Sequence, residues 1–211
     1  MLESITKSLR RLKTDYVDLF FAHRYDPEVP MEEIVSAMHS GEGVRPLLGH
    51  LGVARIAEAV AFAKANGLHP PVVEQPQYSM LYRERVENEI LPEAERSGMG
   101  LVVWSPLAMG MLTGRYDQGI PEESRFARYP QFAERFLTEE NRKKVLKLKE
   151  VADELGLTRT QLALAWVLRL PGISSAITGA TRPEQIRESL EAAGVDLPKE
   201  ALDKIEAILQ T

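Results

Sequence analysis

Two turns of this 211-residue chain carry groups that could bind an anion. In the first, Trp104-Ser-Pro-Leu-Ala-Met-Gly110, a serine hydroxyl and backbone amides directly follow the apolar run 100–104. In the second, Thr178-Gly-Ala-Thr-Arg-Pro-Glu-Gln185, a glycine turn leads into a helix expected to begin near Pro183. Amides at a helix N-terminus attract phosphate, and proline is favoured at the start of a helix. Both turns therefore suit a phosphorylated ligand, the first of them a diphosphate.

His23 is the candidate for proton chemistry, because it directly follows the apolar run 17–22. A lone histidine at the end of a strand is more often structural, yet catalytic groups lie at the carboxyl ends of barrel strands. The four histidines of the chain show no metal-ligand spacing, and the chain contains no cysteine. We therefore expect neither a metal site nor disulfides.

Five short apolar runs alternate with helical patterns, which predicts strand–helix repeats and a parallel sheet. The runs cover residues 17–22, 46–53, 71–74, 100–104 and 175–177. Helices are expected over 2–13, from 31 to 38, over 55–66, 83–97, 141–155 and 160–170, from about 183 onwards, and over 201–209. Residues 111–136, rich in glycine, proline and charge, are expected to form a long loop, and such loops usually serve binding.

Composition excludes several classes of protein. With 44% hydrophobic and 27% charged residues, the chain suits one sizeable globular core. A net charge of −5 argues against a nucleic-acid partner. Neither an apolar stretch long enough for membrane insertion nor a signal peptide is evident. The lack of cysteine suits a cytoplasmic protein.

The motifs of the chain resemble those of the aldo-keto reductase family. Residues 8–27 resemble the fourth strand of that family and the helix before it. Glu74–Tyr78, Trp104–Leu107 and Gly179–Gln185 resemble the ends of strands six, seven and eight. The likeness is to the branch that includes the voltage-gated potassium channel β-subunits, through Asp26-Pro27, Met31-Glu-Glu33, Thr113-Gly-Arg-Tyr-Asp117, Gly119-Ile-Pro121 and Ser124-Arg125. The resemblance implies an α/β fold: one domain over 1–211, a partial (β/α)8 TIM barrel that holds strands four to eight.

The resemblance also implies an NADP(H) cofactor. Gln75 would bond the nicotinamide carboxamide, and the ring of Trp104 would stack on the nicotinamide. Ser105, Leu107 and Ala108 would line the cofactor. The residues alone leave open a core tryptophan beside a turn and a solvated glutamine at a strand end.

The rest of the implied cofactor site lies in the long loop and in the last turn. Arg115 and Arg125 would clamp the diphosphate as the loop closes, although a charged loop is usually just solvated. The adenosine end would be held by Gly179, Thr181 and Gln185 at the 2′-phosphate and ribose, and by Glu188 and Ser189 at the adenine. Position 189 is often asparagine in the family, which puts the adenine contact of Ser189 in doubt.

The family's catalytic set is Asp, Tyr, Lys and His, of which this chain matches only His23. The other three belong to strands one to three, and none of the six tyrosines matches the proton donor. We therefore expect this chain alone to lack the family's turnover. Five strands cannot close an eight-stranded barrel, so we also expect exposed edge strands that promote self-association or pairing with another chain.

Residues 39–55 depart from the family, whose fifth strand ends in Trp-Gly-Thr-Ser. When one GC-rich back-translation of 46–55 is read one base later, it gives Pro-Tyr-Trp-Gly-Thr-Ser, as in the potassium-channel-like branch. We hypothesise that this segment is translated out of frame. Such a shift would remove the fifth strand and its cofactor serine and leave 39–55 poorly ordered. The genomic codons test the hypothesis.

Three functions remain open at this point. The first is an NADPH-dependent reductase of small aldehydes or ketones, truncated here and catalytically incomplete. The second is a non-catalytic subunit that senses NADP(H), as the channel β-subunits would imply, and the third is an inert gene fragment. His23 favours the first ancestry, because the channel β-subunits commonly carry asparagine at this position.

Overall fold

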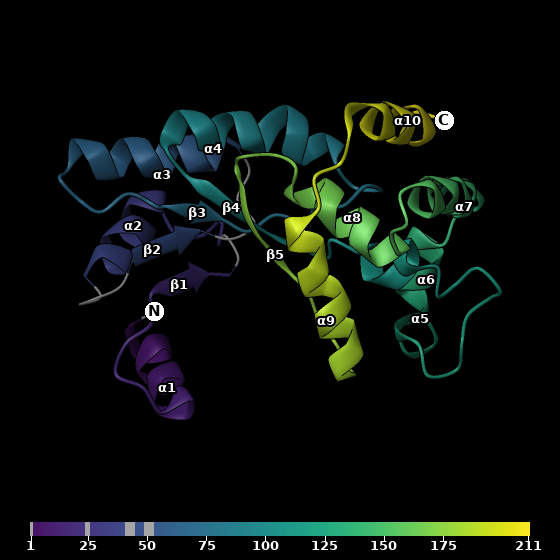
Figure 1. Ribbon diagram of the computed structural model, residues 1–211. Coiled ribbons are helices and arrows are strands. Elements are labelled where there is room, and N and C mark those ends of the chain that lie inside the picture. Colours follow the sequence, from purple (N-terminus) through teal and green to yellow (C-terminus); the bar gives the residue numbers. More distant parts are fainter. Residues whose placement is uncertain (1, 24–25, 41–44, 49–52) are drawn as a thin grey trace. The chain divides into compact units, whose positions relative to one another are not determined.

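The computed structural model describes residues 2–23, 26–40, 45–48 and 53–211. These residues form two compact units (Figure 1). Unit 1 comprises Met1–Pro76 and Glu84–Val102, and unit 2 comprises Gln77–Arg83 and Val103–Thr211. The chain therefore passes between the units three times, once within a strand, although its motifs predict a single domain.

Unit 1 contains the first strand–helix repeats of the chain. Its elements are α1 (Leu2–Leu12), β1 (Leu19–Ala22), α2 (Met31–His39), β2 (Arg45–Leu48), α3 (Val53–Ala65), β3 (Val73–Glu74), the π-helix η1 (Val86–Ile90), α4 (Leu91–Ser97) and the first residues of β4 (Gly100–Trp104). The strands pair in parallel and in chain order, with Ala22 opposite Leu48, Leu48 opposite Glu74, and Glu74 opposite Leu101. The predicted parallel α/β sheet is confirmed.

The core of unit 1 lies along two amphipathic helices. The buried side chains of α2 and α3 recur at helical spacing, which brings each set to one face of its helix: Met31, Ile34, Val35 and Met38 in α2, and Ile56, Ala59, Val60 and Ala63 in α3. The two helices contact each other. Burial of these apolar faces stabilises this repeat by about 25 cal/mol per Å² removed from water.

Unit 2 begins within β4 and ends at the C-terminus. Its elements are the 3₁₀ segment η2 (Ala108–Thr113), α5 (Arg125–Arg128), α6 (Pro130–Phe136), α7 (Glu139–Glu154), α8 (Arg159–Leu168), β5 (Ile173–Ile177), α9 (Pro183–Glu191), η3 (Ala192–Gly194) and α10 (Lys199–Leu209). In the strand order, β5 follows β4. Seven of the ten residues of α8 are buried, including Trp166, so α8 is the central helix of this unit.

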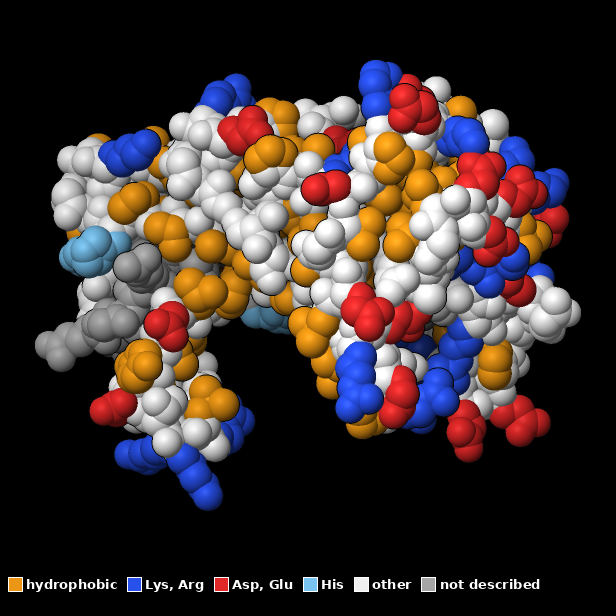
Figure 2. Space-filling model, in the orientation of Figure 1, with side chains coloured by type: hydrophobic (Ala, Val, Ile, Leu, Met, Phe, Trp, Pro, Cys, Tyr) orange, Lys and Arg blue, Asp and Glu red, His pale blue; other side chains and the backbone are white. Residues whose placement is uncertain are grey.

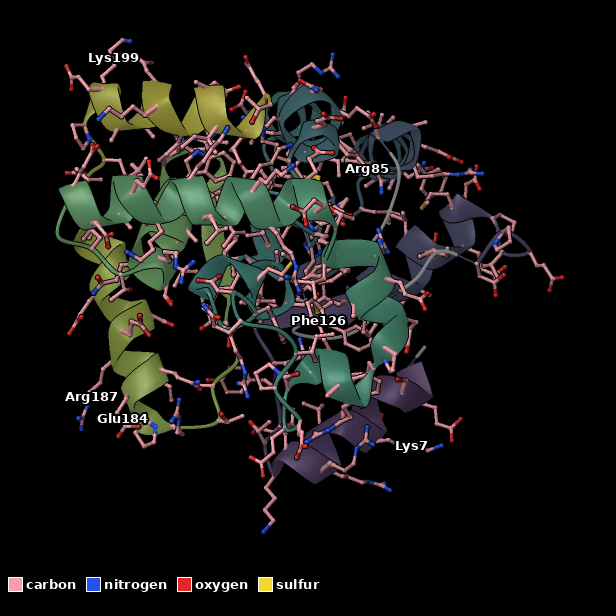
Figure 3. All side chains as sticks on the ribbon, turned by 90° about the vertical axis from the view of Figure 1, so that its right-hand side faces the viewer. Lys7, Arg85, Phe126, Glu184, Arg187 and Lys199 are labelled. Atoms are coloured by element: carbon pink, nitrogen blue, oxygen red, sulfur yellow. The ribbon has the colours of Figure 1, made fainter. Side chains whose placement is uncertain are left out.

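The expectation of one long loop over 111–136 is wrong at 111–113, which belong to η2, and in its second half, which contains α5 and α6. Ser124 accepts a hydrogen bond from the Ala127 amide and caps the start of α5, and Pro130 occupies the first turn of α6. Phe126 and Phe136, each 1% exposed, anchor these helices. Figure 3 shows Phe126 among the interior side chains. The short helices exist because a tertiary aromatic cluster holds them, which local composition does not reveal.

The atypical segment 39–55 falls partly outside the described residues, which leave out 41–44 and 49–52. Within it, Arg45–Leu48 forms β2 between β1 and β3. The expected loss of a strand within 39–55 is therefore wrong, because β2 is present there. The reading-frame hypothesis itself stays a prediction.

Large apolar side chains are exposed on both units. They include Leu12 and Tyr16 in unit 1, and Ile177, Ile186 and Leu190 in unit 2. Figure 2 shows hydrophobic side chains among the charged ones over α1 and over α9. In the part of the chain that the structure describes, no helix has the length and apolar character needed to span a membrane.

Candidate functional site

The turn after β4 contains an unusual run of left-handed backbone. Ser105, Ala108 and Met109 have φ angles of 55°, 47° and 59°, and Gly110 follows with 98°. A non-glycine residue in this region costs about 1–2 kcal/mol, because its Cβ crowds the following carbonyl. Such backbone persists only where surrounding structure imposes it, and it concentrates at functional sites. The predicted diphosphate turn is therefore the most strained segment of the described chain.

Hydrogen bonds within the turn hold this conformation. The Gly110 amide donates to the Leu107 carbonyl at 2.9 Å, and the Gly110 carbonyl accepts from the Thr113 hydroxyl at 2.8 Å. The Tyr116 hydroxyl donates to the Met109 carbonyl at 3.4 Å. Tyr116 in turn stacks on Phe126, with ring centroids 4.3 Å apart. The strained turn is thus fixed to the aromatic core of unit 2.

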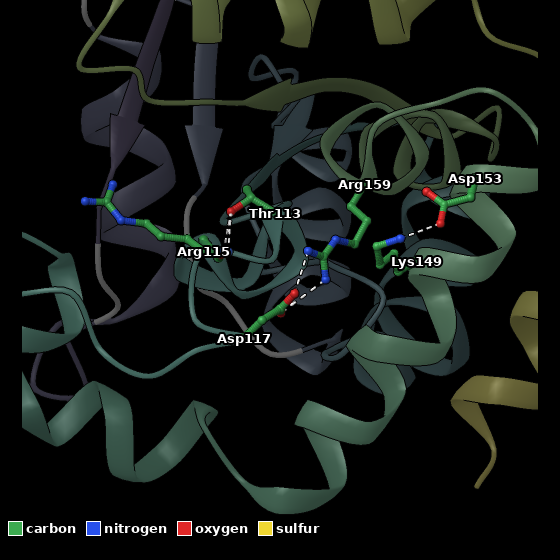
Figure 4. A network of polar contacts seen from close by, with 7 residues as sticks. Thr113, Arg115, Asp117, Lys149, Asp153 and Arg159 are labelled. Carbon is green, nitrogen blue, oxygen red and sulfur yellow. Dashed lines mark hydrogen bonds and ion pairs between the residues drawn. The ribbon is translucent and has the colours of Figure 1, made fainter.

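A semi-buried ion pair supports the far side of the same loop. The Arg159 guanidinium donates to both carboxylate oxygens of Asp117, at 3.1 and 2.7 Å (Figure 4). Gly114 lies against this pair, and a Cβ at this position would overlap the guanidinium. Gly114 also has a φ of 80°, so backbone and packing both require glycine. Asp117 lies within the loop motif recognised in the sequence, but its partner 42 positions away did not stand out.

The two predicted diphosphate cations, Arg115 and Arg125, are both exposed. The Arg115 side chain extends away from the Arg159–Asp117 pair (Figure 4). Arg125 Nη1 lies 3.3 Å from the Met109 sulfur, at the strained turn. Among the described residues, neither arginine forms an ion pair.

The turn after β5 carries the second predicted anion site. The Thr181 amide donates to Gln185 Oε1 at 2.8 Å, and the Thr181 hydroxyl lies 3.3 Å from the same oxygen. The structure thus brings together two of the residues predicted at the 2′-phosphate, beside the exposed Gly179. This contact holds the Thr181 amide just before α9, a helix of nine residues.

The two predicted adenine contacts lie one turn further along α9. The Ser189 hydroxyl donates to the Gln185 carbonyl at 2.8 Å, and Glu188 is half-buried. None of the residues of α9 is buried. Figure 3 shows Glu184 and Arg187 projecting outward from this helix. The adenosine part of the candidate site therefore lies on a helix that contributes no buried side chain to the core.

His23 and Gln75 belong to unit 1. His23 directly follows Ala22, and Gln75 directly follows Glu74. Ala22 and Glu74 lie at the same level of the sheet, because both pair with Leu48 of the strand between them. The side chains of His23 and Gln75 therefore start from one edge of the parallel sheet, where its strands end. His23 is exposed and Gln75 is half-buried. The remaining predicted site residues belong to unit 2.

Tyr78 has a structural role. Its hydroxyl accepts a hydrogen bond from Arg169 at 2.9 Å, its ring stacks on Trp166 at 5.5 Å, and its side chain is fully buried. The Arg169 guanidinium lies 3.6 Å from the centroid of the Trp166 ring. This cluster joins the strand end near Gln77 to α8 within unit 2. Tyr78 and Arg169 are 91 positions apart, so patterns of neighbouring residues do not reveal this cluster.

Comparison with known proteins identifies the family. The chain matches the model of the aldo/keto reductase family over residues 1–210, and it belongs to this family. It is 44% identical to a probable voltage-gated potassium channel subunit beta of Arabidopsis thaliana, and 43% identical to a protein of the same description from Oryza sativa subsp. japonica. Each alignment covers all of this chain and 67% of the relative. The resemblance inferred from the motifs is confirmed.

Proposed function

We propose that this chain binds NADP(H) as an aldo-keto reductase, with the diphosphate at the turn after β4. The observation that carries the proposal is the left-handed run over Ser105 and Ala108–Gly110, which Arg125 contacts at Met109 and which Arg115 follows in the chain; neither arginine has an ion-pair partner among the described residues. Uncompensated guanidinium groups suit the planar, charged oxygens of a diphosphate. Ser105, Leu107 and Ala108 would line the cofactor there.

The adenosine end of the cofactor fits the start of α9. Gly179 leaves the backbone open, and Thr181 and Gln185 form a preorganised pair of polar groups at the helix N-terminus. A 2′-phosphate would be favoured by the N-terminus of α9 and by the helix dipole. Glu188 and Ser189, one turn further, would contact the adenine.

The reaction of the family is reduction of an aldehyde or ketone. The bound nicotinamide supplies the hydride. We propose that Trp104 and Gln75 orient that ring, and that His23 orients the carbonyl of a small substrate. A proton must reach the carbonyl oxygen, and none of the tyrosines of this chain matches the family's donor. We therefore expect the 211-residue chain by itself to bind NADPH without reducing a carbonyl.

Three finer assignments accompany this proposal. The five described strands correspond to strands four to eight of the family barrel, which is supported by their order in the sheet and by the parallel pairing of β1 to β4. The exposed Ile186 and Leu190 of α9 support the prediction that the chain self-associates or pairs with another chain. We place the protein in the cytoplasm, which its cysteine-free composition favours.

Titration with NADPH, followed by the fluorescence of Trp104 and Trp166, tests cofactor binding. The double variant R115A/R125A should lower the affinity about tenfold or more, because each arginine contributes a charge-assisted contact. R128A is the matched control, since Arg128 is another exposed arginine at the end of α5. Absence of binding at millimolar NADPH, or equal losses in the control, would contradict the proposal. Oxidation of NADPH with a test aldehyde would contradict the expected lack of turnover.

A second candidate function is that of a regulatory subunit that responds to NADP(H). The relatives at 43–44% identity, described as probable potassium channel β-subunits, favour it. Binding of NADPH without turnover is common to both functions. Co-purification with the cytoplasmic part of a voltage-gated potassium channel, altered by NADPH, would distinguish the regulatory function.

A further inference from the structure

Unit 2 contains a cavity of about 130 Å³ on the side of the loop that carries Tyr116 and Asp117. Its apolar lining comes from η2, from the residue after α6 and from the middle of α7, namely Met111, Leu137, Val145 and Leu146. Its volume is close to that of engineered apolar cavities of about 150 Å³ that bind benzene. None of the residues predicted to bind NADP(H) lines it. This cavity therefore remains unassigned by the proposed function.

The polar groups around the cavity leave one excess positive charge. Asp117 is neutralised by Arg159, and the Tyr116 hydroxyl already donates to the Met109 carbonyl. At the rim, Lys143 lies 3.9 Å from Glu139, and both side chains are largely exposed, so they offset each other only weakly. Arg142 is half-buried, and within the described residues its guanidinium forms no ion pair or hydrogen bond.

We propose that this cavity binds a small organic monocarboxylate with a compact apolar body, such as an aromatic ring. The Arg142 guanidinium would bind the carboxylate through paired N–H donors, a geometry that matches two carboxylate oxygens. The apolar body would contact Met111, Val145 and Leu146. A dianion fits less well, because Glu139 lies at the same rim and would repel a second negative charge.

Occupancy of the cavity should also affect the cofactor. Met111 and Tyr116 line the cavity, and the Tyr116 hydroxyl holds the Met109 carbonyl of the strained turn. A ligand that fixes this segment would therefore change NADPH affinity, and NADPH would change the affinity for the carboxylate by the same factor. This consequence rests on the proposed function, whereas carboxylate binding itself does not.

Calorimetric titration of the purified chain with benzoate, without NADPH, tests the proposal. We expect saturable binding, and a loss of about tenfold or more in R142Q, because a charged hydrogen-bonding partner is removed. K147Q is the control, since Lys147 is exposed on the same helix and does not line the cavity. L146E, which alters an exposed lining residue, should abolish binding without unfolding the protein.

Three outcomes would overturn the proposal. They are a lack of benzoate binding at millimolar concentration, equal affinity in R142Q and the parent chain, and equal affinity for benzoate and neutral benzamide. Circular dichroism of each variant verifies that it is folded. If benzoate binds as expected while NADPH does not, the cavity assignment holds and only the proposed function fails.

Discussion

The two candidate anion sites of unit 2 are built in different ways. The turn after β4 contains left-handed backbone at Ser105, Ala108 and Met109, and it is braced by the aromatic core and by the Arg159–Asp117 pair. The turn after β5 is ordered mainly by the Thr181–Gln185 contact, on a helix without buried residues. The first is held by tertiary structure and the second by local contacts. Mutations at the first should therefore affect folding, and those at the second should affect mainly binding.

The largest effect is expected for G114A. The added Cβ would overlap the Arg159 guanidinium, and alanine disfavours the φ of 80°. We expect a loss of about 3 kcal/mol or more in the free energy of unfolding, measured by urea denaturation. G119A is the control, because Gly119 also has positive φ, but a Cβ there meets nothing within 4 Å. Equal losses in both variants would show that backbone strain alone matters.

Removal of the Arg159–Asp117 ion pair should have the next largest effect on stability. R159M leaves the semi-buried Asp117 carboxylate without its partner, which should cost about 1–3 kcal/mol of stability. K149M is the control on the neighbouring exposed pair with Asp153 (Figure 4), and it should cost less than about 1 kcal/mol. Thermal unfolding measures both. If K149M lowers the stability as much as R159M does, the semi-buried pair is not a special support of the loop.

A smaller effect on stability, but a clear one on binding, is expected for Q185A. It removes the acceptor of the Thr181 amide at the exposed start of α9. Stability should fall by no more than about 1 kcal/mol, whereas NADPH affinity should fall about tenfold. E184A, at a neighbouring exposed position, is the control. If Q185A unfolds the protein as G114A is expected to do, the two turns do not differ as we infer.

The smallest effect concerns pH. The Arg83 guanidinium, which contacts Glu206 at 2.5 Å, lowers the pKa of that carboxyl below its ordinary value of 4.5. The ionised form is thus favoured by folding, so this stabilisation is present above pH 4.5 and is lost as pH falls through the lowered pKa. Because Glu206 is 41% exposed, the gain is below about 1 kcal/mol. E206Q should flatten the dependence of thermal stability on pH in this range, and an unchanged slope would contradict the assignment.

Sequence reasoning located most elements well. The expected helix over 2–13 is α1, the expected strand over 100–104 is β4, and the expected helix near Pro183 is α9. Strand lengths were less accurate: β3 contains only Val73 and Glu74 of the expected run 71–74. Apolar runs show where the chain is buried. The ends of a strand depend on hydrogen bonds to the neighbouring strand, and the local sequence does not reveal where that neighbour begins and ends.

The sequence by itself determined the family, the strand–helix order and the position of each candidate anion turn after a strand. These features depend on residue types and on spacings of a few positions, which act locally. Only the tertiary structure decided the left-handed backbone at Ala108 and Met109 and the pairing of Arg159 with Asp117. Local propensity disfavours that backbone, and partners 42 positions apart meet only when the surrounding core packs, so neither feature can be read from neighbouring residues.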